Sequence, residues 1–238
     1  MTPPANPERD KNHRVPGEII SHGVWLYARF PLSDRDGQER RFERGIDVTY
    51  EAIRQWCLKC GPDDATQLRR QRPRTGNNWH RDEVFLPING TRHDWWRAVD
   101  QDDTGLDILG QSRRNQTAAK KLCRQLLQGV PYVPRVVITD QFKSDGAATR
   151  EMRPGVEHRQ RRDLQNRGEP SPRPTRPRER RLQGCTSPGH AQRVLSAYGP
   201  IAQHFRPRRH RLSAAAYRPE MRNRFARWAE ITGTERAA

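Results

Sequence analysis

Long apolar runs are missing from this chain of 238 residues, and hydrophobic residues make up only 32% of it. A membrane-spanning helix needs about 20 consecutive apolar residues, so we expect no transmembrane segment. The opening stretch MTPPANPERDKNHR lacks the apolar centre of a secretory signal. We therefore expect a cytosolic protein with one sizeable core and long solvated stretches.

Cysteine is also scarce, with four residues in the chain. Cys57 and Cys60 form a Cys-x-x-Cys motif, whereas Cys123 and Cys185 provide no second pair at matching spacing. One such motif is half of a zinc site. Two interpretations stay open: two small half-buried residues, or a zinc site in a basic structural protein that binds nucleic acid.

Acidic residues are outnumbered, with 28 Asp and Glu against 45 Lys and Arg, a formal charge of +17 and a pI near 10.9. Arginine dominates, and from Arg150 to Ala238 there are 21 arginines against 8 acidic residues. A guanidinium binds phosphate through two hydrogen bonds, although codon usage in a GC-rich genome would also favour arginine. The charge predicts a polyanionic partner, with nucleic acid favoured over a membrane surface.

Two apolar patterns near the start predict helices. EIISHGVWLYARF has apolar residues close to a helical repeat, and GIDVTYEAIRQWCLKC offers Thr49 as a cap before Ile53 and Trp56. This outline predicts a helix-turn-helix over residues 16–62, after a mobile tail of residues 1–15. Its second helix would present Arg54 and Lys59 to DNA.

The segment SDRDGQERRFERG lies where a helix-turn-helix has its middle helix. Phe42 is its one apolar residue and Gly37 interrupts it, so it is predicted to be a poor helix. Residues 63–78, which include four arginines, are predicted to form a basic linker.

The pattern then becomes typical of strands. Apolar residues alternate from Val84 to Ile88, Asn89-Gly90 predicts a type I′ hairpin, and TRHDWWRAVDQ supplies the returning strand. GLDILGQS predicts a third strand. Pro87 places the end of the first strand at an edge or a bulge.

A helix and two further strands follow. NQTAAKKLCRQLLQG predicts an amphipathic helix, PRVVITD a buried strand that ends at Asp140, and GVEHRQ a fifth strand. This order predicts an α/β, ribonuclease-H-like core over residues 79–190, with a mixed five-stranded sheet and flanking helices. Residues 191–238 would form a basic carboxyl-terminal helical region.

Two carboxylates are expected to meet in such a sheet, because Asp82 lies in the first strand and Asp140 ends the neighbouring fourth strand. Adjacent carboxylates repel unless a cation lies between them, and hard oxygen ligands suit Mg²⁺ or Mn²⁺. Glu169 would supply a third carboxylate from a helix. The alternative is that both aspartates are ordinary strand-end acids.

Five stretches together carry a family resemblance: WHRDEVFLPING, RAVDQDDTGLDILGQSRR, PRVVITDQFKSDGAA, GVEHRQ and FRPRRHRLSAAAYRPEMRNRF. With EIISHGVWLYARFPLS and YEAIRQWCLKCGP, the chain from about His13 to Gly233 resembles the DDE transposases of the insertion-sequence-six family. The resemblance implies a catalytic triad of Asp82, Asp140 and Glu169, Mg²⁺ or Mn²⁺, and helix-turn-helix recognition of terminal inverted repeats. It also implies DNA cleavage and strand transfer in the bacterial nucleoid, by a protein that acts as a homo-oligomer.

The chain departs from the family around the third carboxylate, where Glu169 follows a glycine and precedes prolines at 170, 172, 174 and 177. Proline opposes a regular helix. Two hypotheses therefore stand within the family. One is an active transposase in which Arg206, Arg208 and Arg209 contact phosphates, and the other is an impaired copy that retains DNA binding.

Overall fold

In the computed structural model the chain is described in segments: residues 14–30, 32–72, 76–101, 105–111, 133–139, 155–160, 187–207 and 212–234, with residues 121, 124 and 126. Residues 1–13 of the predicted tail and most of the helix predicted within residues 115–128 lie outside these segments. The described chain divides into two compact units. A helical unit comprises Met1–Gln71 and Ala197–Ala238, and a sheet unit comprises Arg72–Ser196.

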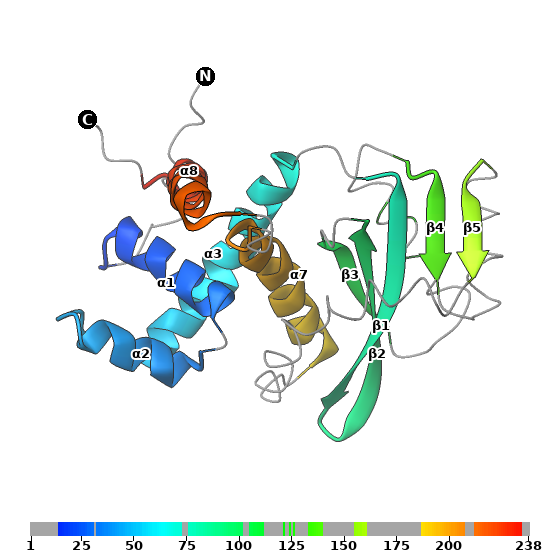
Figure 1. Cartoon of the computed structure of the whole chain (residues 1–238). Helices are drawn as coiled ribbons and strands as arrows, with labels where there is room; N and C mark the ends of the chain where they lie inside the picture. Colours follow the sequence, from blue (N-terminus) through cyan, green and yellow to red (C-terminus); the bar gives the residue numbers. More distant parts are fainter. Residues whose placement is uncertain are drawn as a thin grey trace. The chain divides into compact units, whose positions relative to one another are not determined.

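Three amino-terminal helices and two carboxyl-terminal ones build the helical unit: α1 (Gly17–Arg29), α2 (Asp34–Phe42), α3 (Tyr50–Arg70), the second half of α7 (Pro188–His204), and α8 (Ala214–Thr232) (Figure 1). Apolar residues recur at helical spacing on α1 and α3, so each helix buries one face. Their shared core includes Ile20, Ile53, Trp56, Phe205 and Trp228. None of the described helices is long and apolar enough to cross a membrane.

Helix α2 corrects the prediction of a poor helix. Ser33 accepts from the backbone N–H of Asp36, and the Asp36 carboxylate accepts from the N–H of Ser33, which is a capping box. The buried face consists of Gly37 and Arg41, whereas Phe42 is 70% exposed. Packing of a glycine and an arginine stem therefore replaces the apolar stripe that the sequence lacks.

The predicted linker does not begin at residue 63, because α3 continues to Arg70. Pro62 lies inside the helix and removes one backbone donor. Beyond it Ala65 is fully buried and Leu68 is 6% exposed, so the apolar face continues. Burial of this face offsets the cost of the proline.

The sheet unit contains five strands: β1 (Asn78–Ile88), β2 (Thr91–Asp100), β3 (Gly105–Gln111), β4 (Val136–Thr139) and β5 (Glu157–Gln160) (Figure 1). Their order is β3-β2-β1-β4-β5. The first three are antiparallel neighbours, and β4 and β5 run parallel to β1. This is the predicted ribonuclease-H-like arrangement of a meander followed by two crossovers.

The β1–β2 hairpin confirms the predicted turn, because Asn89 and Gly90 have φ of 49° and 76°. Pro87 also lies where proline is tolerated. Strand β1 pairs with β4 at residues 78–80, whereas Pro87 pairs with Arg92 of β2. Among the described strands, β1 therefore has one neighbour at Pro87, as at a sheet edge, where a missing backbone donor is tolerated.

Each face of the sheet carries its own core. Trp79, Trp96 and Leu109 belong to one cluster. Ile88 and Trp95 belong to the other, which is covered by Ala191 and Leu195 from the first half of α7. By strand alternation, position 82 belongs to this second face.

Candidate functional site

Strand β1 carries the first predicted carboxylate in its middle. The antiparallel ladder places Asp82 opposite Arg97 of β2. The Asp82 backbone is described, but its side chain is not. Arg97 is 7% exposed, so a buried charge lies directly across the ladder from this position.

Strand β4 lies beside β1 and ends one residue before the second predicted carboxylate. The parallel register pairs Asn78 with Val136 and His80 with Ile138, an offset of 58 residues in each case. Asp82 and Asp140 are separated in the sequence by the same 58 positions. Asp140 and Glu169 themselves lie outside the residues that the structure describes.

A buried hydroxyl fixes the last described residue of β4. Thr139 is 1% exposed, and its Oγ1 lies 2.9 Å from Nε2 of His158 on β5. This hydrogen bond ties two parallel strands together next to the point where position 140 follows.

The outer edge of the sheet is closed by a side chain from α7. The N–H of Gly110 donates to Oε1 of Gln192 at 2.8 Å, and Nε2 of Gln192 donates to the carbonyl of Ile108 at 2.7 Å. Edge strands expose such backbone groups, and the Gln192 amide occupies two of them. Helix α7 is thereby anchored over the face to which position 82 belongs.

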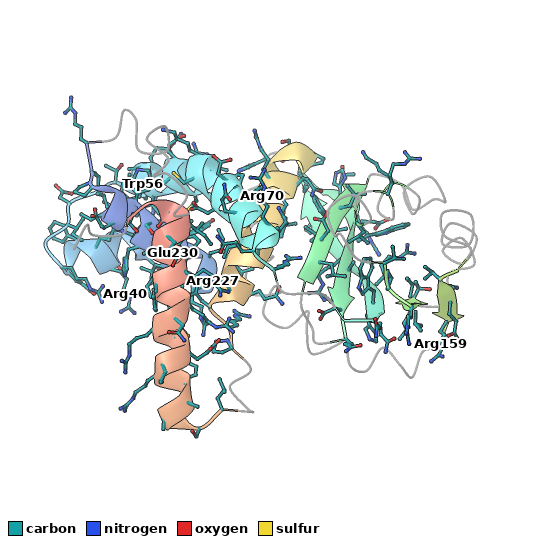
Figure 2. All side chains as sticks on the ribbon, turned by 90° about the horizontal axis from the view of Figure 1, so that it is seen from above. Arg40, Trp56, Arg70, Arg159, Arg227 and Glu230 are labelled. Carbon is teal, nitrogen blue, oxygen red and sulfur yellow. The ribbon has the colours of Figure 1, made fainter. Side chains whose placement is uncertain are left out.

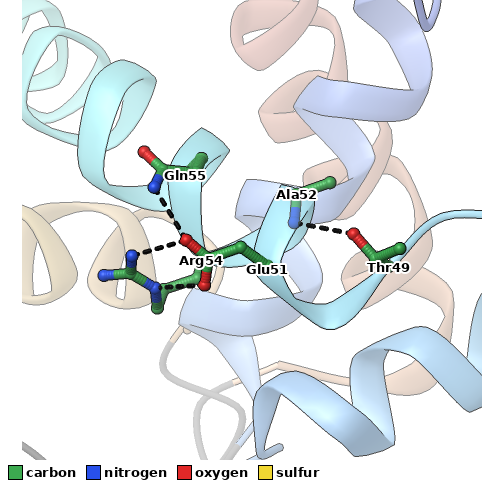
Figure 3. A network of polar contacts seen from close by, with 5 residues as sticks. All are labelled: Thr49, Glu51, Ala52, Arg54 and Gln55. Atoms are coloured by element: carbon green, nitrogen blue, oxygen red, sulfur yellow. Dashed lines mark hydrogen bonds and ion pairs between the residues drawn. The ribbon is translucent and has the colours of Figure 1, made fainter.

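The start of α3 holds the first predicted DNA contact in a charged network (Figure 3). Oγ1 of Thr49 accepts from the N–H of Ala52 at 3.2 Å, which confirms the predicted cap. Nε and Nη2 of Arg54 donate to the two carboxylate oxygens of Glu51 at 2.7 and 2.6 Å, and Gln55 donates to the same carboxylate. These hydrogen bonds, led by that of Arg54, lower the pKa of Glu51 to about 2.

The other predicted DNA contacts are scattered. Lys59 is exposed on α3, and Arg206 follows α7 and is half-buried. Burial lowers the pKa of Arg206, and the nearby positive charge of Arg29 lowers it further. Arg208 and Arg209 lie outside the described residues.

Further exposed arginines lie on the helices of the helical unit. Arg40 on α2, Arg70 on α3 and Arg227 on α8 are examples (Figure 2). The basic character predicted from composition therefore extends over several helices of this unit.

Sequence reasoning missed two residues of these sites, Glu51 and Arg97. The spacing of Glu51 and Arg54 is a local signal that could have revealed the first, because residues three apart on a helix face each other. Arg97 stands in the largely apolar strand WWRAVD, which is a weaker signal. The residues beside Arg97 on the adjacent strands are set by the strand register, which the sequence pattern does not give.

A model of one protein family, described as a DDE domain, matches residues 76–208, which is more than half of the chain. This match includes the whole sheet and both predicted aspartates. The chain belongs to the insertion-sequence-six family of DDE transposases.

Curated relatives agree with this assignment. The chain is 28% identical over 131 residues to the transposase for insertion sequence-like element IS431mec of Staphylococcus aureus strain Mu50. It has the same identity over the same number of residues to the transposase for insertion sequence element IS257 in transposon Tn4003 of S. aureus. The match covers 55% of this chain and 58% of each relative. The family resemblance predicted from sequence motifs is thus confirmed.

Two of the solved structures to which the chain is similar are catalytic core domains of integrases. The catalytic core domain of BIV integrase matches with a TM-score of 0.39 and 13% identity, over 64% of this chain and 99% of that domain. The HTLV-2 integrase core, solved in complex with magnesium, matches with a TM-score of 0.36 and 14% identity, over 53% and 86%. The strand order itself carries the assignment of this chain to the ribonuclease-H-like class.

The donor chemistry of the predicted triad fits a divalent metal, because aspartate and glutamate supply hard oxygen ligands. The described residues of this chain contain no group of three His, Cys, Asp or Glu side chains that could hold a metal. Asp140, Glu169 and the side chain of Asp82 lie outside the described part of the chain.

The cysteine motif lies in the middle of α3. Cys60 is 1% exposed in the core of the helical unit, and Cys57 packs against that core half-buried. Among the described residues no zinc-binding group includes them. Both positions are compatible with small core residues.

Proposed function

We propose that this chain is the transposase of an insertion sequence, which binds terminal inverted repeats and catalyses metal-dependent DNA cleavage and strand transfer. The observation that carries the proposal is the shared offset of 58 residues in the β1–β4 ladder and between Asp82 and Asp140. Membership of the DDE family supports the same reading.

The offset supports a shared carboxylate site. Continued for two positions beyond the pair of His80 and Ile138, the register would set position 140 beside position 82. Position 82 lies two residues beyond His80, and position 140 lies two residues beyond Ile138. Because side chains alternate between the faces of a sheet, positions 82 and 140 would share the face of the His80–Ile138 pair. Two carboxylates on adjacent strands would repel each other and favour a cation between them.

Asp82, Asp140 and Glu169 would hold Mg²⁺ or Mn²⁺ in this proposal. When bound, such ions supply Lewis acidity at the phosphodiester and at the attacking oxygen. The protein contributes the ligand positions, set by two adjacent strands. The Thr139–His158 hydrogen bond keeps the end of β4 in place.

DNA binding would use the basic helical unit. Helix α3 would present Arg54 and Lys59 to a groove, while Arg206, Arg208 and Arg209 would contact phosphates. A formal charge of +17 supports a polyanionic partner. We propose that the protein acts as a homo-oligomer on the two repeat ends, in the bacterial cytoplasm.

The test is strand transfer of a labelled terminal-repeat duplex by purified full-length protein with Mn²⁺. We expect joined products with the wild type and none with Asp82→Ala. Asp94→Asn is the matched control, because Asp94 lies on the neighbouring strand in an ion pair with Arg92. Equal activity of the wild type and Asp82→Ala would refute the assigned site.

One observation favours a second candidate, a copy impaired in catalysis that still binds DNA. The prolines at 170, 172, 174 and 177 oppose a helix at the third carboxylate. In that case the wild type would bind the terminal repeat and give no joined product at any Mn²⁺ concentration.

A further inference from the structure

Arg97 presents a buried charge that the proposed function has not used. Its exposed fraction is 7%, and its strand neighbours Trp95 and Val99 are 0% and 2% exposed. A guanidinium cannot shed its proton in a protein. An isolated buried charge is strongly unfavourable, and an acidic partner on a neighbouring strand would offset that cost.

The strand register limits which acid this partner can be. On its face of the sheet, the ladder places Arg97 directly between Asp82 of β1 and Ile108 of β3. The diagonal positions on β1 are 80 and 84, a histidine and a valine. Among these adjacent ladder positions, Asp82 is the one acid.

Arg81 provides an internal comparison. It is also 7% exposed, but strand alternation assigns it to the opposite face. Its guanidinium carbon lies 4.6 Å from the centroid of the Trp96 ring, so it has a cation–π partner there. Because Trp96 lies on the face opposite to Arg97, strand alternation does not offer this ring to Arg97.

We propose that Arg97 is the counter-ion of Asp82. Directly opposed residues of an antiparallel pair have Cβ atoms about 4.5–5.5 Å apart, within reach of an arginine and an aspartate. The guanidinium would neutralise the carboxylate while no metal is bound, and its positive charge would oppose the binding of a metal ion there. The charge pair itself does not depend on catalysis, whereas its effect on metal binding rests on the proposed function.

A double-mutant cycle in metal-free buffer tests the pair. Unfolding constants are measured in the full chain by amide hydrogen exchange of β1 and β2, for Arg97→Gln, Asp82→Asn and the double variant. Removing one partner of a buried ion pair should raise the constant by roughly 100-fold or more. In the double variant the increase in the unfolding constant should be at least about tenfold smaller than the product of the increases in the two single variants.

Arg92→Gln is the matched control on the same strand, because Arg92 is exposed and lies 3.7 Å from Asp94. Combined with Asp82→Asn, it should give effects that simply multiply. Simple multiplication for Arg97 and Asp82 as well would overturn the proposal.

Metal affinity gives a second readout without DNA, by electron paramagnetic resonance titration of free Mn²⁺. Loss of a neighbouring positive charge should tighten Mn²⁺ binding of Arg97→Gln by roughly tenfold, whereas Arg97→Lys should stay near the wild type. Equal affinity of the glutamine variant and the wild type would overturn the effect on metal. Absence of Mn²⁺ binding by the wild type would instead refute the proposed function, and the cycle alone would then decide the pair.

Discussion

Replacing Glu51 with glutamine tests whether α3 contributes positive charge to DNA binding. In the protein both carboxylate oxygens accept hydrogen bonds from Arg54, and one also accepts from Gln55. Because the pKa of Glu51 is about 2, the carboxylate stays ionised at neutral pH. The pair therefore cancels one positive charge on the helix that we propose meets DNA.

The expected effect is on salt dependence more than on stability. The side chains of Arg54 and Glu51 are 40% and 47% exposed, and exposed ion pairs contribute little to stability. A released guanidinium can neutralise one further phosphate, which steepens the plot of log binding constant against log salt by about 0.9. Over a fourfold change in salt concentration, the ratio of the DNA-binding constants of the variant and the wild type should change by roughly threefold.

The assay is fluorescence anisotropy of labelled terminal-repeat and scrambled duplexes at several salt concentrations. Glu18→Gln is the matched control, because Glu18 is exposed in the first turn of α1 and its replacement changes net charge equally. We expect a steeper slope and tighter low-salt binding for Glu51→Gln alone. Equal slopes for both variants and the wild type would refute the role of α3.

The remaining predictions concern glycines. At Gly23 a Cβ would lie 2.7 Å from the buried guanidinium of α2, whereas at Gly37 its nearest contacts are at 3.5 Å. Gly23→Ala should therefore destabilise the helical unit by about 1–3 kcal/mol. Gly37→Ala should stabilise it by about 1 kcal/mol, because alanine favours a helix more than glycine does. Urea unfolding followed by circular dichroism measures both changes, and the opposite order of stabilities would contradict the described packing of α2. Gly110→Ala would overlap the ring of Trp95 and should speed amide exchange in β2 and β3, unlike Gly155→Ala, whose Cβ would meet open space.

Local signals explain why most of the sheet could be predicted. Alternating apolar residues and the positive-φ turn at Asn89 and Gly90 depend on neighbours a few residues apart, so the hairpin was recognisable in the sequence. The short β-branched run of β4 was equally clear. The family could be recognised too, because its motifs are continuous stretches, and those from Trp79 to Gln160 lie within the residues that the DDE domain model matches.

The helical unit shows where local signals fail. Helix α2 exposes its single large apolar residue, Phe42, and buries Gly37 and Arg41 instead. Helix α3 continues through Pro62 because the residues beyond it are buried. Propensity opposes both outcomes, and tertiary packing outweighs it.

In this protein, local residue patterns were enough to identify the strand segments, the turn of the first hairpin and the family. The tertiary structure decided the register that sets Asp82 opposite Arg97 and gives β1 and β4 their common offset. The physical reason is that successive side chains of a strand point to opposite faces, so the sequence alone predicts which residues of one strand share a face. Which residues of a distant strand lie beside them follows only from hydrogen bonds formed between segments that the folded chain brings together.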